Sequence, residues 1–132
     1  MMEKKYPKIL IAEDDIGFRR LLARFIQRAW PCKIIEAEDG VEVLQIILKE
    51  APDLDLVILD ISLPYVNGLQ VLQIIRSNQR LEHLPIIACT AHGSEEDVAR
   101  ILEHGVNDFI LKPSSKATIL EKVARMLGMP EN

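Results

Sequence analysis

The chain has 132 residues, of which 48% are hydrophobic and 27% charged, so its size and composition fit one soluble globular domain. Its net charge of −4 argues against direct nucleic-acid binding and against binding to acidic membranes, because both carry negative charge themselves. No apolar run approaches the roughly 20 residues that cross a bilayer, and the N-terminus lacks a signal-peptide pattern, so we expect a cytoplasmic protein without a membrane partner.

Five short apolar runs alternate along the chain with segments in which apolar residues recur every three to four positions. The runs cover residues 8–12, 33–37, 56–60, 85–90 and 108–112, and they predict five strands. The segments between and after them predict five helices. In chain order, their apolar stripes are Phe18, Leu21, Leu22, Phe25 and Ile26; Val41, Leu44, Ile47 and Leu48; Val71, Leu72 and Ile75; Val98, Ile101 and Leu102; and Ile119, Leu120, Val123 and Leu127.

Capping residues agree with this division into elements. The side chains expected to cap the first four helices are Asp15, Asp39, Asn67 and Ser94. Gly105 and Gly128 directly follow the last two helices, where a glycine commonly ends a helix. Strands and helices that alternate through short connections imply right-handed crossovers. We therefore predict a single doubly wound (βα)5 domain of the α/β class over residues 1–132, with a five-stranded parallel sheet.

Chemically useful side chains follow four of the predicted strands. In open α/β sheets, ligands bind beyond the carboxyl ends of the strands, near the point where the strand order reverses. The first strand leads into Glu13 and Asp14, and the third ends in Asp60. The fourth strand ends in Thr90 and the fifth in Lys112. We therefore expect these five side chains to meet at one edge of the sheet.

The acidic members of this set predict a metal site. Three carboxylates crowded together without a cation would repel one another, and at least one pKa would rise. An all-oxygen site with few protein ligands suits Mg²⁺. Lys112 supplies a compact positive charge, and the Thr90 hydroxyl can donate a hydrogen bond to the same oxygen group. These parts suit phosphoryl transfer, which makes Asp60 the nucleophile and an acyl phosphate the product.

Four motifs make the chain resemble the receiver domain of two-component response regulators, in particular the chemotaxis regulators: EDD at 13–15, LDISLPYVNG at 59–68, CTA at 89–91 and FILKP at 109–113. The resemblance runs from about residue 8 to 127 and implies a flavodoxin-like strand order, 2-1-3-4-5. It implies that a sensor histidine kinase or a histidine phosphotransfer protein donates a phosphoryl group to Asp60. The protein would then be no enzyme, except that it catalyses its own phosphorylation and autodephosphorylation.

The resemblance also implies which residues hold the metal. Asp14, Asp60 and the backbone carbonyl of Ser62 would bind Mg²⁺, for which Mn²⁺ could substitute, and Glu13 would complete the acidic pair. Ser62 would also affect the rate of dephosphorylation, as would His92.

Thr90 and Phe109 would be the switch residues, with Phe109 in place of the more frequent tyrosine. Phosphorylation would draw Thr90 inward and let Phe109 pack behind it. The face formed by the fourth helix, the fifth strand and the fifth helix would change, and an unknown downstream protein would bind there. The family pattern further implies a cis peptide bond between Lys112 and Pro113.

Three other functions compete with this interpretation. A Mg²⁺-dependent phosphatase with an aspartyl nucleophile would need a second acid two positions after Asp60, where the chain has Ser62. A flavodoxin-like cofactor binder would need a phosphate-binding loop after the first strand, where three acids occur. A degenerate receiver could serve as an interaction scaffold, although all five key side chains are present.

Two groups of residues stand outside the predicted site. The two cysteines, Cys32 and Cys89, form no CxxC motif and are expected to be reduced core thiols. The predicted first helix carries four arginines, which form either a solvated face or a rim that attracts an acidic partner: Arg19, Arg20, Arg24 and Arg28.

Overall fold

Five strands form one parallel sheet in the computed structural model, which describes residues 6–91 and 93–130. The strands are β1 (Lys8–Ala12), β2 (Lys33–Ala37), β3 (Leu56–Asp60), β4 (Ile86–Thr90) and β5 (Asp108–Leu111). Their order, β2-β1-β3-β4-β5, confirms the predicted topology. Because β1 pairs with β2 on one side and with β3 on the other, the strand order reverses between β1 and β3. A ligand site is therefore expected where these two strands end.

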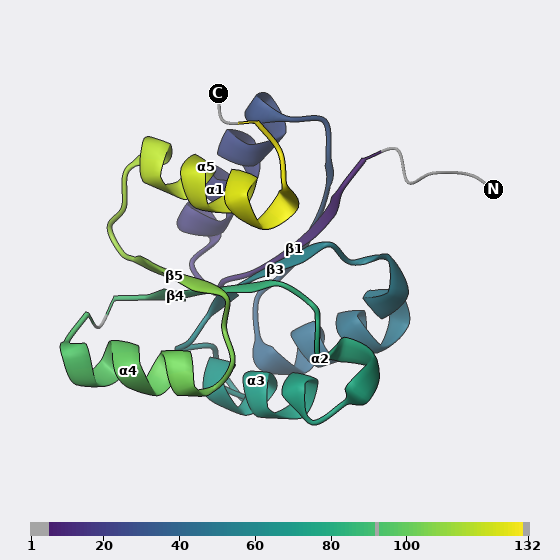
Figure 1. Ribbon diagram of the computed structural model, residues 1–132, viewed down its shortest axis with the longest axis vertical. Helices are drawn as coiled ribbons and strands as arrows, with labels where there is room; N and C mark the ends of the chain where they lie inside the picture. Colours follow the sequence, from purple (N-terminus) through teal and green to yellow (C-terminus); the bar gives the residue numbers. More distant parts are fainter. Residues whose placement is uncertain (1–5, 92, 131–132) are drawn as a thin grey trace.

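Helices cover both faces of this sheet (Figure 1). Helices α1 (Ile16–Ala29) and α5 (Lys116–Leu127) lie on one face, and α2 (Gly40–Glu50), α3 (Gly68–Arg76) and α4 (Glu95–Glu103) lie on the other. Two short 3-10 turns, Ala51–Asp53 and Gln79–Leu81, follow α2 and α3. Each face has its own apolar core, so the sheet is buried from both sides. Within the described ranges, no helix is long and apolar enough to span a bilayer.

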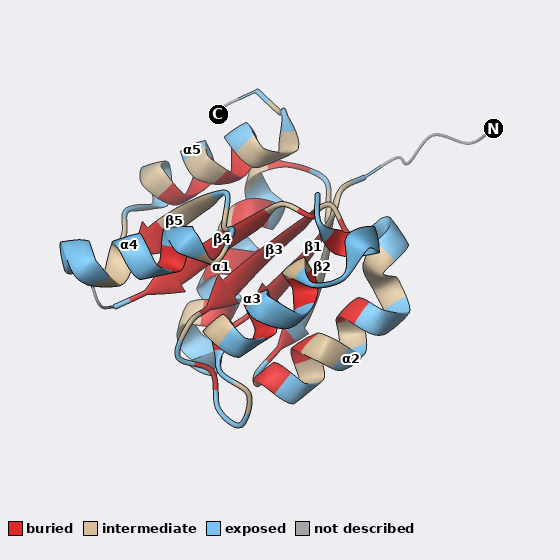
Figure 2. Ribbon diagram, turned by 60° about the horizontal axis from the view of Figure 1, so that its bottom comes forward, coloured by how far each residue is buried: buried red, intermediate tan, exposed pale blue. Residues whose placement is uncertain are grey.

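Strand β3 lies at the centre of the sheet, and all five of its residues are buried (Figure 2). Leu56 and Ile58 belong to the core beneath α1 and α5. Val57 and Leu59 belong to the core beneath α2 and α3. Side chains alternate between the two faces of a strand, so a strand covered on both sides needs apolar residues throughout. This requirement explains the continuous apolar run that ends at Asp60.

Most of the predicted helix ends are confirmed. Each of the four predicted N-cap side chains accepts the backbone N–H of the third residue of its helix: Asp15 from Phe18, Asp39 from Glu42, Asn67 from Gln70 and Ser94 from Asp97. Gly105 and Gly128 have φ angles of 87° and 66°, the left-handed conformation that glycine adopts without strain. No cap was predicted for α5, although Ser115 is a residue type that commonly caps helices, and its side chain accepts the Thr118 N–H.

Two predicted strand ends were wrong by one residue. Strand β4 begins at Ile86 and not at Pro85, because proline has no N–H for the ladder. Strand β5 ends at Leu111 and not at Lys112, although the Lys112 N–H still donates to the Thr90 carbonyl at 2.8 Å. The peptide bond between Lys112 and Pro113 is cis, as predicted. The predicted domain also includes residues 1–5 and 131–132, which lie outside the described residues.

Candidate functional site

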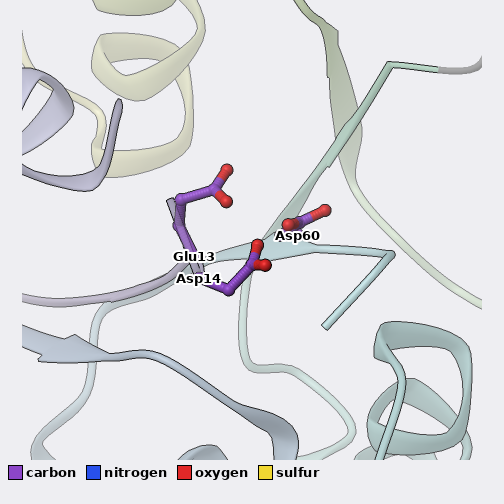
Figure 3. Close-up of side chains that lie close together, drawn as sticks. All are labelled: Glu13, Asp14 and Asp60. Carbon is purple, nitrogen blue, oxygen red and sulfur yellow. The ribbon is translucent and has the colours of Figure 1, made fainter. Parts of the chain in front are cut away.

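Three carboxylates meet where β1 and β3 end (Figure 3). One oxygen each from Glu13, Asp14 and Asp60 lies within 4.8 Å of the others. Glu13 is 2% exposed and Asp60 3% exposed, whereas Asp14 is open to solvent. The structure thus brings together the acidic residues that the sequence placed at this edge.

Every polar group of Glu13 takes part in a hydrogen bond or an ion pair. Its backbone N–H donates to the Ala37 carbonyl at 2.9 Å, which ties the end of β1 to β2. Its backbone carbonyl accepts from Arg19 Nη1 at 2.8 Å. In the side chain, Oε2 accepts the Asp15 N–H at 3.0 Å, and Oε1 accepts from Lys112 Nζ in an ion pair. This acid therefore has a single defined position.

Lys112 is the cation that faces the carboxylates. Besides its ion pair with Glu13, its Nζ lies 3.5 Å from Asp60 Oδ2 and 5.0 Å from the centre of the Phe18 ring. Burial by itself would lower the pKa of Lys112, but the hydrogen bond to Glu13 and the charges of Asp60 and Glu13 outweigh it and raise the pKa. Lys112 therefore stays protonated throughout the neutral range.

Burial raises the pKa of Glu13 from its ordinary value of 4.5 to about 7. The hydrogen bonds from Lys112 and from the Asp15 N–H lower this pKa, and the charge of Asp60 raises it further. One lysine thus does not compensate for three carboxylates, two of which are almost completely buried.

The donor set fits a hard divalent cation. Carboxylate oxygens from three residues converge within 4.8 Å, and Lys112 leaves two of their three negative charges unbalanced. Oxygen ligands with excess negative charge are the ligands that Mg²⁺ prefers, and it binds with few protein groups because it retains several waters.

Asp60 and Thr90 end neighbouring strands. The register of β3 and β4 aligns Asp60 with Cys89, so Thr90 lies one residue beyond it. Thr90 is 1% exposed and therefore belongs to the floor of the site. Asp60 Oδ1 accepts the Ser62 N–H at 3.0 Å, which orients the carboxylate at the end of the strand.

The loop after β3 is held by close backbone contacts at two glycines. Gly68 donates its N–H to the Ile61 carbonyl at 2.9 Å, and Gly40 donates to the Pro64 carbonyl at 3.2 Å. A Cβ atom added to Gly40 would lie 1.7 Å from the Val66 carbonyl oxygen, so no side chain fits there. The loop that carries Ser62, itself exposed, is therefore fixed against the start of both α2 and α3.

Phe109 lies away from this cluster, in β5, and is half-buried. Lys122 of α5 holds it: the Lys122 Nζ lies 4.8 Å from the centre of the Phe109 ring and donates to the Phe109 carbonyl. The same Nζ lies 3.2 Å from Asp108 Oδ1. His92, which the family resemblance predicts to affect the rate of dephosphorylation, is outside the described residues.

The sequence analysis did not predict that Arg19, near the site, is buried. We expected the four arginines of α1 to form either a solvated face or a rim for an acidic partner, and three of them are exposed, but Arg19 is only 7% exposed. Its position could have been recognised from helical spacing, because residue 19 is followed at three and seven positions by the buried Leu22 and Ile26.

Both cysteines are free thiols, and burial raises the pKa of Cys89 to about 12.

The chain matches the family model of the response regulator receiver domain over residues 9–124. A chemotaxis protein CheY homolog of Campylobacter jejuni is 32% identical over 121 residues, which cover 92% of this chain and 92% of the relative. Among solved structures, chemotaxis response regulator CheY4 of Vibrio cholerae is similar with a TM-score of 0.85 and 25% identity, covering 93% of this chain and 100% of that one.

A chain in the CheX–CheY–BeF3–Mg²⁺ complex from Borrelia burgdorferi has a TM-score of 0.83 and 28% identity to this one. The match covers 90% of this chain and 87% of the Borrelia chain. Similarity in sequence and in fold therefore extends over the elements that carry the acidic cluster, Lys112 and Thr90.

Proposed function

Since the chain belongs to the response regulator receiver domain family, a family of signalling proteins and not of conventional enzymes, we propose that it accepts a phosphoryl group on Asp60. The donor is the phosphohistidine of a sensor histidine kinase or of a histidine phosphotransfer protein. The observation that carries the proposal is the convergence of two further carboxylates and one lysine on Asp60, at the point where the strand order reverses.

The attacking group is the Asp60 carboxylate. It is 3% exposed, and its Oδ1 is oriented by the Ser62 N–H, so the nucleophile is positioned before the donor arrives. As an Asp60 oxygen forms its bond to phosphorus, the bond from phosphorus to the donor's imidazole nitrogen breaks, and the electron pair of that bond returns to the imidazole.

Lys112 and Thr90 stabilise the transferred group. Lys112 Nζ lies 3.5 Å from Asp60 Oδ2, close enough to neutralise charge on a phosphoryl oxygen bonded to that carboxylate. The Thr90 hydroxyl, one residue beyond the register partner of Asp60, donates to a second phosphoryl oxygen. Such fixed donors matter because positioning and charge neutralisation dominate phosphoryl transfer.

Glu13, Asp14, Asp60 and the Ser62 carbonyl would hold Mg²⁺, and Mn²⁺ could take its place. When bound, the ion supplies positive charge that lets the carboxylates approach a phosphoryl group without repulsion. The Mg²⁺ in the Borrelia complex supports this choice of metal. The chain's own residues present oxygen ligands at a rigid strand end, and Lys112 favours the ionised form of Glu13.

Phosphorylation then changes a protein-binding face. Thr90 moves toward the phosphoryl group, and Phe109, which Lys122 holds half-buried, packs into the space behind it. This movement alters the surface of α4, β5 and α5, where a downstream protein binds. Ligand-dependent change of this kind requires only that the partner prefer one of the two conformations.

The test is labelling with acetyl phosphate and Mg²⁺, followed by intact mass measurement. We expect one added phosphoryl group in the wild-type protein, labile to base, and none in Asp60→Asn. Asp53→Asn, which changes an exposed aspartate in the turn after α2, is the matched control and should be labelled like the wild type. Equal labelling of Asp60→Asn and wild type would refute the assignment of Asp60.

A further inference from the structure

Arg19 is a buried cation beside the site whose role the proposed function does not explain. Its Nε lies 2.8 Å from Glu36 Oε1 in β2, and its Nη1 donates to the backbone carbonyl of Glu13 at 2.8 Å. The other three arginines of α1 are exposed. A buried guanidinium is costly unless it is paired and hydrogen-bonded, so its retention at this position requires both contacts.

The carbonyl that Arg19 binds belongs to the peptide bond between Glu13 and Asp14. Because a peptide unit is planar, fixing its carbonyl oxygen fixes the direction in which the Asp14 Cα leaves it. The N–H of Glu13 is held by Ala37 and its side chain by Asp15 and Lys112. Arg19 thus supplies the remaining constraint on the backbone that leads into Asp14.

Asp14 depends on this constraint more than its neighbours do. Within residues 6–91 and 93–130, its carboxylate has neither a hydrogen bond nor an ion pair, and it is exposed. Glu13 and Asp60, in contrast, have side chains oriented by hydrogen bonds. Only the backbone therefore determines where the Asp14 carboxylate points.

We infer that Arg19, held by Glu36, is a positioning residue that orients Asp14 for binding of a divalent cation. The inference rests on the proposed function, since it concerns the same metal site. Groups that orient metal ligands from one layer further out commonly change metal affinity 10- to 100-fold when they are removed. The competing explanation is that Arg19 merely ties α1 to β2, which would affect stability alone.

The two explanations differ in the expected Mg²⁺ affinity of folded Arg19→Met, measured by calorimetric titration. Positioning predicts a dissociation constant roughly 10- to 100-fold above that of the wild type. It also predicts that the amide resonance of Asp14 shifts in the metal-free protein, because the Glu13 carbonyl of the same peptide unit loses its hydrogen bond from Arg19. Arg24→Met, which removes an exposed arginine of the same helix, is the matched control and should bind Mg²⁺ like the wild type. A dissociation constant of folded Arg19→Met within about twofold of wild type would overturn the inference.

A second variant decides the question if Arg19→Met does not fold. Glu36→Ala removes the carboxylate that holds Arg19 and leaves α1 and the Glu13–Asp14 loop unchanged in sequence. We expect weaker Mg²⁺ binding than in the wild type, and unchanged affinity would overturn the inference. Failure of the wild-type protein to bind Mg²⁺ would instead refute the metal site itself, so the two failures are distinguishable.

Discussion

The raised pKa of Glu13 predicts that the metal-free protein loses stability as the pH rises from 5 to 8. Burial raises this pKa from 4.5 to about 7, so the folded state binds the proton more tightly than the unfolded state does. The stability contributed by this proton is complete below pH 4.5, and it is lost as the pH rises through 7. At about 1.4 kcal/mol for each pH unit between the two pKa values, the loss from Glu13 is roughly 3 kcal/mol.

The assay is urea denaturation without metal at several pH values, followed by the fluorescence of Trp30, the single tryptophan, which is buried. Glu13→Gln cannot ionise, and the remaining titrating groups are common to both proteins. We expect the free energy of unfolding of the wild type to fall by about 2 to 3 kcal/mol relative to Glu13→Gln between pH 5 and 8.

Mg²⁺ should offset this loss, because it binds the ionised carboxylates. At about 100 times its dissociation constant, it should add roughly 2.7 kcal/mol at pH 8. Parallel pH dependence of wild type and Glu13→Gln without metal would show that the burial of Glu13 is not what limits stability, and would refute the reasoning.

Two further predictions concern residues outside the acidic cluster. Tyr65 has a φ of 68° and is 86% exposed, so Tyr65→Asn relieves strain without removing packing, and it should raise the free energy of unfolding by roughly 0.5 to 1 kcal/mol in urea titrations. An unchanged or lower value would contradict this. Arg76 donates hydrogen bonds at 2.8 to 3.0 Å to carbonyls of Gly105, Leu81, Glu82 and Leu84. Arg76→Met should lower the free energy of unfolding by about 2 to 4 kcal/mol, whereas the exposed Arg80→Met should have almost no effect.

The strands and most helix ends were predictable because local signals determine them, whereas the strand order followed from the resemblance to the receiver family. Continuous apolar runs mark strands that are buried on both faces, and Asp39 or Asn67 caps a helix through its own backbone a few residues away. The meeting of Asp60 with the acids after β1 was predictable as well, because parallel strands present their carboxyl ends at one edge.

Contacts between segments that are distant in the sequence were harder to predict. The burial of Arg19 depends on Glu36, which is 17 residues away on another strand, and arginine on a helix is normally exposed. The left-handed conformation of Tyr65 was equally hard to predict, since contacts of Gly40 with Pro64 and Val66 determine the conformation of the loop around it. Helical spacing places Arg19 on the buried stripe of its helix, but its partner Glu36 and the conformation of Tyr65 follow only from how the elements pack.

Asp60 is the last residue of a strand without solvent exposure and the immediate neighbour of a largely exposed loop. Opening free energies in proteins range from near zero in surface loops to the global value in core strands. Because β3 is buried on both faces, we expect its backbone amides to exchange with solvent only when the whole domain unfolds. A covalent mark on Asp60 would therefore be anchored in a strand that opens last, and it would lie directly beside the loop that follows this strand.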